Sequence, residues 1–301
     1  MIIKINNRIK HKLLRYINKT TPGVGQYLRQ CQFQIKCLLY KSRIKKYVLD
    51  KMKEKTFPLF NMIEIETINK CNGTCKFCPV NRNNDSRPRS VMSEKLYCSI
   101  IRQLHDLNYA DQINIFSNNE PLLDKRTVKF CSHAREKVPK AFLVLYTNGT
   151  LLTPEIFAGL MKSLDSLVID NYIEDLDNYK LIKPVQELYD RFKDDDRYNN
   201  VEIHIRDVNE VLYTRGGNSP NRTKVSLTTN CPCTLPYRQM VIRPDGKISL
   251  CCADTLGEMT LGDAEKMSLV EIWNNDIYKR IRAELLESRA HIKLCSGCDA
   301  I

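Results

Sequence analysis

The 301-residue sequence lacks any uninterrupted apolar run of the roughly 18–20 residues that a membrane-spanning helix needs, which excludes a helical transmembrane protein. The N-terminal residues are basic and interrupted by charges throughout, so they lack the apolar centre of a secretory signal. We therefore expect a cytoplasmic protein. The length allows one large domain with a smaller appendage, and no internal repeat or low-complexity tract is evident.

Cysteine, in contrast, is abundant, because the chain contains 13 of them. Disulfides are rare in a reducing cytosol, and an odd total fits paired cysteines badly. Three cysteines gather near residue 75 and six more follow residue 230. This pattern favours metal binding or catalysis over a disulfide scaffold.

Acidic residues are almost absent from residues 1–57, which contain 15 lysines and arginines but only Asp50 and Glu54. Most of this segment, residues 27–52, is predicted to be helical. Two interpretations remain open. The segment contacts an anionic partner such as a membrane surface, a polyanionic substrate or nucleic acid, or it is a solvated helix that packs apolar side chains on the main domain. The side chains expected to pack are Leu38, Leu39, Ile44 and Val48.

The middle of the chain alternates predicted strands and helices. Strands are expected at residues 62–67, 113–116, 141–146, 167–170 and 201–206, with a sixth strand as an option at 224–228. Ser93 and the Thr153–Pro154 pair are typical helix starts, and further helices are expected at 125–137 and 184–192. Such alternation predicts an α/β fold with a parallel sheet, open or closed into a barrel, whose ligand lies at the carboxyl ends of the strands.

The sequence changes in character after about residue 221. Residues 239–242 and 247–250 flank the turn Pro244-Asp245-Gly246, which predicts a β-hairpin. A helix is expected near residues 268–286, followed at once by Cys295 and Cys298. We therefore expect three parts: a basic helical extension (1–57), an α/β domain (58–220) and a small cysteine-rich module (221–301).

The first cysteine group, Cys71, Cys75 and Cys78, directly follows the first strand of the α/β domain, at the mouth of the sheet. Three thiolates on one short loop suit three irons of a [4Fe–4S] cluster and leave the fourth iron free for a ligand. Structural zinc is the alternative, but zinc takes four ligands, and no fourth lies on this loop.

The spacing CxxxCxxC, with Phe77 before the last cysteine, resembles the signature of the radical S-adenosylmethionine (SAM) superfamily. The resemblance implies a partial (β/α) TIM-like barrel of five or six parallel strands. It also implies that the open iron binds SAM, which is cleaved to a 5′-deoxyadenosyl radical that abstracts hydrogen from a substrate. Residues 117–122 resemble the family's GGEP motif with asparagines in place of both glycines, and Thr147-Asn148-Gly149 resembles its TNG turn. The implied cofactor-binding residues are Phe77, Asn118, Asn119, Glu120, Thr147, Asn148, Asp170 and Arg206.

The second cysteine group resembles the twitch form of the SPASM auxiliary domain, a β-hairpin plus helix that binds one further [4Fe–4S] cluster. The implied ligands are Cys233, Cys251, Cys295 and Cys298, and Cys231 and Cys252 are neighbours that could replace one of them. A full SPASM domain binds two clusters with more cysteines downstream; the sequence given stops at Ile301, so we expect one cluster. A four-cysteine zinc ribbon is the alternative for this module taken alone.

One auxiliary cluster suits an oxidation, because it can accept the electron that remains after hydrogen abstraction. The combination is similar to the dehydrogenases of aminoglycoside biosynthesis, which implies oxidation of a secondary alcohol of a sugar or cyclitol. Arg215 or Arg206 would then bind the substrate oxygen. The expected partners are a small-molecule substrate rather than a peptide and an electron donor such as flavodoxin or ferredoxin.

Three other functions stay open. One is a peptide-modifying maturase, although residues 1–57 look too short and too helical for a leader-recognition domain. Another is a sugar epimerase, for which Cys98 or Cys131 would be the available thiol. The third is a zinc-bearing nucleic-acid-binding protein that uses the basic N-terminus.

Overall fold

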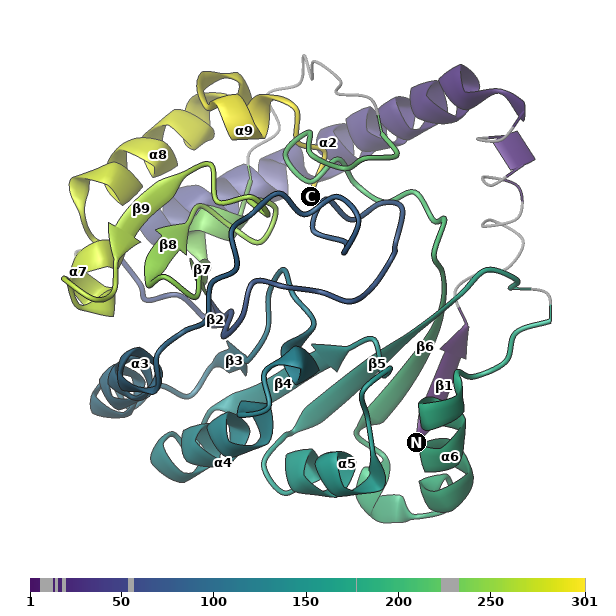
Figure 1. Cartoon of the computed structure of the whole chain (residues 1–301). Helices are drawn as coiled ribbons and strands as arrows, with labels where there is room; N and C mark the ends of the chain where they lie inside the picture. The colour runs from purple at the N-terminus through teal and green to yellow at the C-terminus, as the bar shows by residue number, and fades with distance from the viewer. Residues whose placement is uncertain are drawn as a thin grey trace.

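The computed structural model describes residues 1–5, 13, 16–17, 20–53, 57–176, 178–222 and 233–300. These residues form one mixed sheet in the order β1-β6-β5-β4-β3-β2-β7-β8-β9 (Figure 1). The strands are β1 (Ile2–Ile5), β2 (Met62–Ile65), β3 (Gln112–Asn114), β4 (Phe142–Thr147), β5 (Ser166–Ile173), β6 (Val201–Asp207), β7 (Gln239–Ile242), β8 (Lys247–Ser249) and β9 (Thr260–Asp263). Neighbours from β1 to β7 in this order run parallel, and β8 and β9 are antiparallel.

The helices between the parallel strands lie along the outer side of the curved sheet (Figure 1). They are α3 (Glu94–Asp106), α4 (Thr127–Lys137), α5 (Pro154–Met161) and α6 (Lys183–Phe192), with short 3₁₀ turns at Pro121–Leu123 and Asp196–Tyr198. Ser93 and Thr153 cap their helices as expected, by accepting from the backbone N–H of Leu96 and Ile156. The predicted α/β fold is therefore confirmed, and each of the five predicted barrel strands is present.

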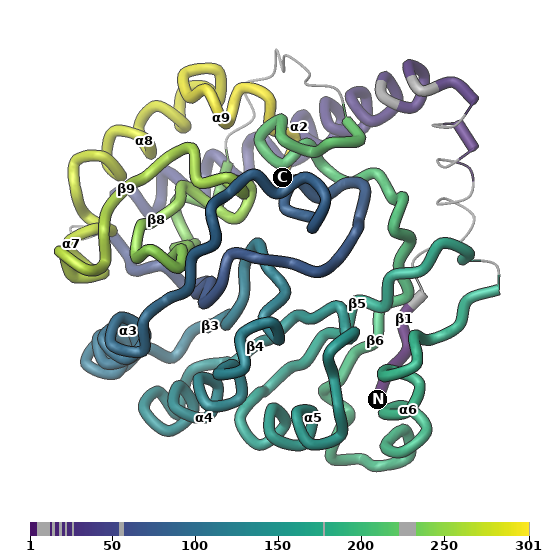
Figure 2. Tube along the Cα trace, viewed as in Figure 1, coloured from purple at the N-terminus to yellow at the C-terminus, as the bar shows by residue number. Residues whose placement is uncertain are grey.

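The N-terminal segment departs from the all-helical expectation. Ile2–Ile5 form β1, which pairs in parallel with β6 in the register Ile2↔Glu202 to Ile5↔Ile205. The outer edge of β6 would otherwise expose unpaired backbone groups, and an isoleucine-rich segment is well suited to cover it. The alternative sixth strand at residues 224–228 lies outside the described residues. The chain trace in Figure 2 shows the N-terminus at this edge of the sheet, close to α6.

The long helix α2 (Pro22–Met52) packs through one face only. Phe33, Cys37 and Val48 are buried on it, which confirms Val48 and leaves Ile44 half-buried. Leu38 and Leu39 were expected to pack but are 79% and 68% exposed, because they lie on the opposite face of the helix. None of the described helices is long and apolar enough to cross a membrane.

The C-terminal module extends the same sheet, since β7 pairs in parallel with β2. The single helix expected at 268–286 is divided into α7 (Leu269–Trp273) and α8 (Asp276–Glu287), because Asn275 caps a new helix by accepting from the N–H of Tyr278. Short turns at Leu235–Tyr237 and Arg289–His291 and the last helix, α9 (Lys293–Ser296), complete the module.

Arg282 of α8 fastens this module to the chain segment before β2. Its guanidinium lies 4.0 Å from the ring centre of Phe57 and 4.1 Å from that of Trp273. It also donates hydrogen bonds to the carbonyls of Pro236 (3.0 Å) and Trp273 (2.7 Å). Burial lowers the pKa of Arg282 to about 10, so the side chain stays charged at neutral pH.

We predict that Arg282→Ala lowers the free energy of unfolding by about 2–4 kcal/mol, because it removes charge-assisted hydrogen bonds and cation–π contacts together. Urea unfolding of the purified protein measures this. Arg280→Ala, on the exposed side of the same helix, is the control and should change stability by less than about 0.5 kcal/mol. Equal stability of the two variants would contradict the anchoring role.

Candidate cofactor and substrate site

A cavity of about 260 Å³ opens at the carboxyl ends of the parallel strands, and we call it the central cavity. Every residue of the barrel that was expected to bind the first cluster, SAM or the substrate oxygen lines it. These are Cys71, Cys75, Phe77, Cys78, Asn118, Asn119, Glu120, Thr147, Asn148, Asp170, Arg206 and Arg215. The motifs that lie up to about 140 residues apart in the chain therefore meet around one space, as the fold class predicts.

The loop that carries Cys71, Cys75 and Cys78 is folded by its own hydrogen bonds. The buried Asn81 side chain donates to the carbonyls of Cys75 (3.1 Å) and Cys78 (2.8 Å), and Gly73 N–H donates to Cys71 Sγ (3.3 Å). Burial raises the pKa of the Cys71 and Cys75 thiols to about 12. They are therefore protonated when free, and binding of a metal there must release their protons.

Glu120 joins the loops that follow β3 and β4. Its carboxylate accepts hydrogen bonds from Thr147 Oγ1 (2.7 Å), Asn148 N–H (2.8 Å) and Leu122 N–H (3.1 Å). Asn148 in turn donates to Asn72 Oδ1 (2.7 Å) in the cysteine loop. Burial raises the pKa of Glu120, and its three donors oppose that shift by stabilising the charged form. The EP and TNG motifs thus hold each other and the cysteine loop in place.

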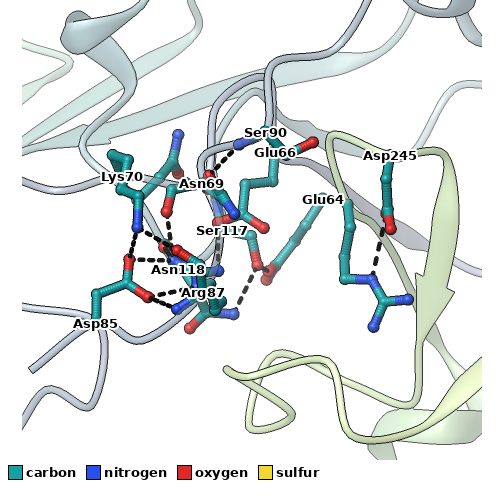
Figure 3. Close-up of polar contacts among 12 residues, drawn as sticks. Glu64, Glu66, Asn69, Lys70, Asp85, Arg87, Ser90, Ser117, Asn118 and Asp245 are labelled. Atoms are coloured by element: carbon teal, nitrogen blue, oxygen red, sulfur yellow. Dashed lines mark hydrogen bonds and ion pairs between the residues drawn. The ribbon is translucent and has the colours of Figure 1, made fainter.

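Arg87 ties the cysteine loop to β2 and to the loop after β3 (Figure 3). Its guanidinium pairs with Glu66 (3.2 Å) and Asp85 (3.0 Å), and it also donates to the carbonyls of Asn69 (2.6 Å) and Asn118 (3.0 Å). The side chain of Arg87 is only 10% exposed. A planar donor group with several N–H directions suits a junction of three segments.

Arg206 is engaged by two carboxylates at the opposite wall of the cavity. It donates to Asp170 (3.2 Å) and to Glu210 (2.7 Å), and it lies 5.3 Å from the ring centre of Tyr172. The sequence had indicated Asp170 and Arg206, whereas Glu210 and Tyr172 were missed because neither belongs to a motif. Arg206 remains a predicted cofactor or substrate contact.

Arg215 has fewer partners within the described residues. It donates to Asn118 Oδ1 (3.3 Å) and lies over the ring of Tyr213 (5.3 Å), but its buried Nε has no hydrogen-bond partner there. Nδ2 of Asn119 is also buried without a partner among the described residues. Buried donors are normally satisfied, so these two fit a polar ligand in the cavity.

Four thiols surround a second, smaller cavity, which we call the four-thiol site. They are Cys233, Cys251, Cys295 and Cys298, and this grouping matches the expected set. Burial raises the pKa of Cys251, Cys295 and Cys298. Cys252 does not line this cavity, and Cys231 lies outside the described residues.

Four thiols around one cavity match the ligand set of a [4Fe–4S] cluster. In the part of the chain that the structure describes, no three histidine, cysteine or acidic side chains converge as ligands of one metal ion would. A [4Fe–4S] cluster takes one thiolate at each iron, so its ligands surround a larger volume than the four ligands of zinc.

The turn Arg215-Gly216-Gly217 connects the two sites. Arg215 (φ 49°) lines the central cavity, whereas Gly216 (φ 65°) lines the four-thiol site. A Cβ atom at Gly216 would lie 2.5 Å from Leu294 Cδ1 of α9. The glycine therefore allows close approach to the helix that carries Cys295.

Two comparisons identify the class of protein. The radical SAM superfamily matches residues 65–201, and the SPASM iron–sulfur cluster-binding domain matches residues 231–299. The chain belongs to the radical SAM superfamily and carries a SPASM domain, which confirms the expected family and its cofactors, SAM and an auxiliary iron–sulfur cluster. This membership argues against a zinc-bearing nucleic-acid-binding protein.

Among particular proteins, this chain is similar to the S-adenosyl-L-methionine-dependent 2-deoxy-scyllo-inosamine dehydrogenase of Niallia circulans. The two sequences are 30% identical over 244 residues, which cover 81% of this chain and 94% of the relative. The crystal structure of BtrN in complex with AdoMet and 2-DOIA matches with a TM-score of 0.70 and 27% identity, over 81% of this chain and 94% of BtrN. SuiB of Streptococcus suis bound to the precursor peptide SuiA has a TM-score of 0.57 and 16% identity, over 84% of this chain and 74% of SuiB, and shares the fold alone.

We predict that Arg87→Leu destabilises the protein by about 3–5 kcal/mol, because Glu66 and Asp85 lose the cation that compensates their burial. Thermal unfolding monitored by circular dichroism measures the change. The matched control is Arg89→Leu, two residues away and exposed. If Arg87→Leu unfolds at the temperature of the control, Arg87 does not organise the loop.

Proposed function

We propose that this protein oxidises a secondary alcohol of a small sugar or cyclitol to a ketone. The observation that carries the proposal is the pair of thiol sites joined by a single turn, with a cavity lined in part by polar side chains at one of them. The similarity to a 2-deoxy-scyllo-inosamine dehydrogenase along most of both chains supports the same chemistry here. The proposed parts of the chain are the basic extension (1–57), the barrel (58–220) and the auxiliary module (221–301), with β1 of the extension completing the barrel sheet.

The thiols of Cys71, Cys75 and Cys78 would hold a [4Fe–4S] cluster with one open iron, and the four-thiol site would hold a second cluster. When bound, SAM supplies the hydrogen-abstracting radical and the second cluster supplies an electron acceptor. Asn118, Asn119, Glu120, Thr147, Asn148, Asp170, Phe77 and Arg206 would contact the cofactor. Arg215 would bind the substrate oxygen through the donor that has no partner within the described chain.

In this reaction the carbinol carbon loses a hydrogen atom, the hydroxyl group loses a proton, and one electron leaves the substrate. The C–O single bond thereby becomes a carbonyl, and the substrate has lost two hydrogens overall. A flavodoxin or ferredoxin would supply the electron that starts each cycle, which is consistent with the expected cytoplasmic location.

The alternatives have less support. The similarity to a 2-deoxy-scyllo-inosamine dehydrogenase along most of both chains favours a small molecule over a peptide. An epimerase needs a hydrogen donor at the cavity; Cys98 is exposed on α3 and Cys131 is buried in the core against α3, and neither lines the central cavity.

Iron analysis tests the cluster assignment. Anaerobically reconstituted protein should contain about eight irons per chain, and the triple variant Cys71→Ala/Cys75→Ala/Cys78→Ala about four. Loss of all iron in the triple variant, or of none, would contradict two independent sites. The control is Cys98→Ala, an exposed cysteine outside both groups, which should leave the iron content unchanged.

We predict that Cys295→Ala separates cleavage of SAM from oxidation of the substrate. The variant should still form 5′-deoxyadenosine with substrate present, because the first thiol group is intact, but the yield of ketone per 5′-deoxyadenosine should fall at least tenfold. Chromatography of both products measures the ratio. A ratio equal to that of the wild-type protein would remove the electron-accepting role of the four-thiol site.

We further propose that α2 rests on an anionic membrane surface. Val24, Tyr27, Leu28, Ile35, Leu38 and Leu39 form an exposed apolar stripe on the face away from the domain. Exposed cations flank the stripe at Lys36, Lys41, Lys45 and Lys46. An apolar stripe edged by cations is suited to the headgroup boundary of an anionic bilayer.

Vesicle flotation tests this contact. The protein should float with vesicles that contain phosphatidylglycerol, less so in high salt, and Leu38→Ser/Leu39→Ser should abolish flotation. Met267→Ser/Val270→Ser changes exposed apolar residues of the auxiliary module and serves as control. A stripe variant that floats as well as the control would rule out the proposed contact. If the wild-type protein self-associates and does not float, the stripe instead contacts a second copy of the chain.

A further inference from the structure

A chain of hydrogen bonds leads from the central cavity to the peptide next to Cys251. Ser117, which lines the cavity, donates through its hydroxyl to Glu64 Oε2 (2.6 Å). The other Glu64 oxygen accepts from Gln239 Nε2 (2.7 Å), and Gln239 Oε1 accepts from the backbone N–H of Cys252 (3.1 Å). Figure 3 shows the link between Ser117 and Glu64 at the start of this chain.

Glu64 is a buried carboxylic acid in the middle of a core strand, which is an unusual position for this residue type. In β2 the side chains of Ile63 and Ile65 belong to the hydrophobic core, so Glu64 points to the inside of the sheet, where it is 6% exposed. Burying a carboxyl group costs free energy, and the cost is greater for its charged form than for its neutral form unless a cation compensates the charge. Burial accordingly raises the pKa of Glu64 to about 7, although hydrogen bonds from Ser117 and Gln239 oppose the shift.

The charged and titratable groups around Glu64 come from several elements. Arg215, from the turn after β6, favours its charged form, and a charged Glu64 in turn raises the pKa of the neighbouring Glu66 and of the Cys252 thiol. Glu66 is itself paired with Arg87. These opposing influences leave both protonation states of Glu64 accessible near neutral pH.

We propose that Glu64, acting through the hydroxyl of Ser117, receives the proton that the substrate alcohol loses during oxidation. The inference rests on the proposed function and names a proton path that its chemistry requires. The substrate O–H bond breaks, its proton passes to Ser117 Oγ, and the proton of Ser117 passes to the Glu64 carboxylate. The carbonyl of the product forms as one electron leaves the substrate toward the four-thiol site. The cluster proposed there is the electron acceptor, so atoms and charge balance without a further oxidant.

The other acids at the cavity are less suited to this role. Both oxygens of Glu120 are occupied by three donors. Asp170 pairs with Arg206 and lies against His204, and Glu210, which also pairs with Arg206, does not line the cavity. Arginine cannot accept a proton, so Arg215 can only orient the substrate oxygen. Glu64 also lies on the auxiliary side of the cavity, where proton uptake would compensate the negative charge that an arriving electron brings.

The first test measures ketone per 5′-deoxyadenosine between pH 6 and 9 with 2-deoxy-scyllo-inosamine as the probe. In the wild type this ratio should rise with pH through about 7, because only the deprotonated carboxylate accepts a proton. Glu64→Gln and Ser117→Ala should lower the ratio at least tenfold and remove the pH-dependent limb. Glu64→Asp and Ser117→Thr retain the carboxyl and hydroxyl groups. These variants should recover part of the ketone yield per 5′-deoxyadenosine and its rise with pH.

The second test needs no substrate turnover. The reduction potential of the auxiliary cluster, followed by electron paramagnetic resonance, should depend on pH in the wild type and in Glu64→Asp but not in Glu64→Gln. Iron content and circular dichroism establish that each variant is folded and loaded. If the wild type does not oxidise the probe, the proposed function fails for that substrate, and this second measurement still decides whether Glu64 takes up a proton.

Two results would overturn the inference: a Glu64→Gln protein with the wild-type product ratio and pH profile, or identical pH dependence of the potential in Glu64→Gln and wild type. A Ser117→Ala protein that behaves as wild type while Glu64→Gln does not would remove Ser117 from the path.

Discussion

The parallel pairing of β7 with β2 is the contact on which the arrangement of both thiol sites depends. The loop after β2 carries Cys71, Cys75 and Cys78, and the hairpin that begins with β7 leads to Cys251. This pairing fixes the auxiliary module against the barrel sheet. β8 then returns antiparallel to β7, so Cys251 lies level with Gln239 at the start of β7, next to the strand that leads to the cysteine loop. Arg282 reinforces it from the outside by holding α7 and α8 against the segment that enters β2.

In the loop after β3, polar side chains occupy the positions that glycines occupy in the related cofactor-binding motif. Asn118 and Asn119 stand where the related motif has glycine. Asn118 contacts Arg215 and the carbonyl of Cys252 in neighbouring loops, and Asn119 accepts from the N–H of Ser117 within its own loop. Together with Arg87 and Glu120 these contacts order the cavity before a ligand arrives. Such preorganisation favours a defined binding geometry, because fewer groups need to move when the ligand binds.

The sequence was informative where chemistry is local. The cysteine spacings, the Glu-Pro and Asn-Gly turns and the period of the strands predicted both thiol sites, the wall of the central cavity and the α/β fold. It was uninformative where a contact joins distant segments through residues without a motif. β1 was missed because four residues near a terminus have no pattern of their own. Leu38 and Leu39 were assigned to the wrong face because α2 is apolar on two sides. Glu64 could have been found from one signal: a glutamate between two core isoleucines of a strand must point to the inside of the barrel.

The central claim is that an alcohol carbon of a small substrate gives its hydrogen to the cofactor. Mass spectrometry of the 5′-deoxyadenosine released from SAM tests it most directly, with 2-deoxy-scyllo-inosamine that carries deuterium only on the carbon that becomes the ketone. The account predicts one deuterium in the 5′-deoxyadenosine and a ketone that has lost the label. Unlabelled 5′-deoxyadenosine, accompanied by a product that keeps its deuterium, would contradict it.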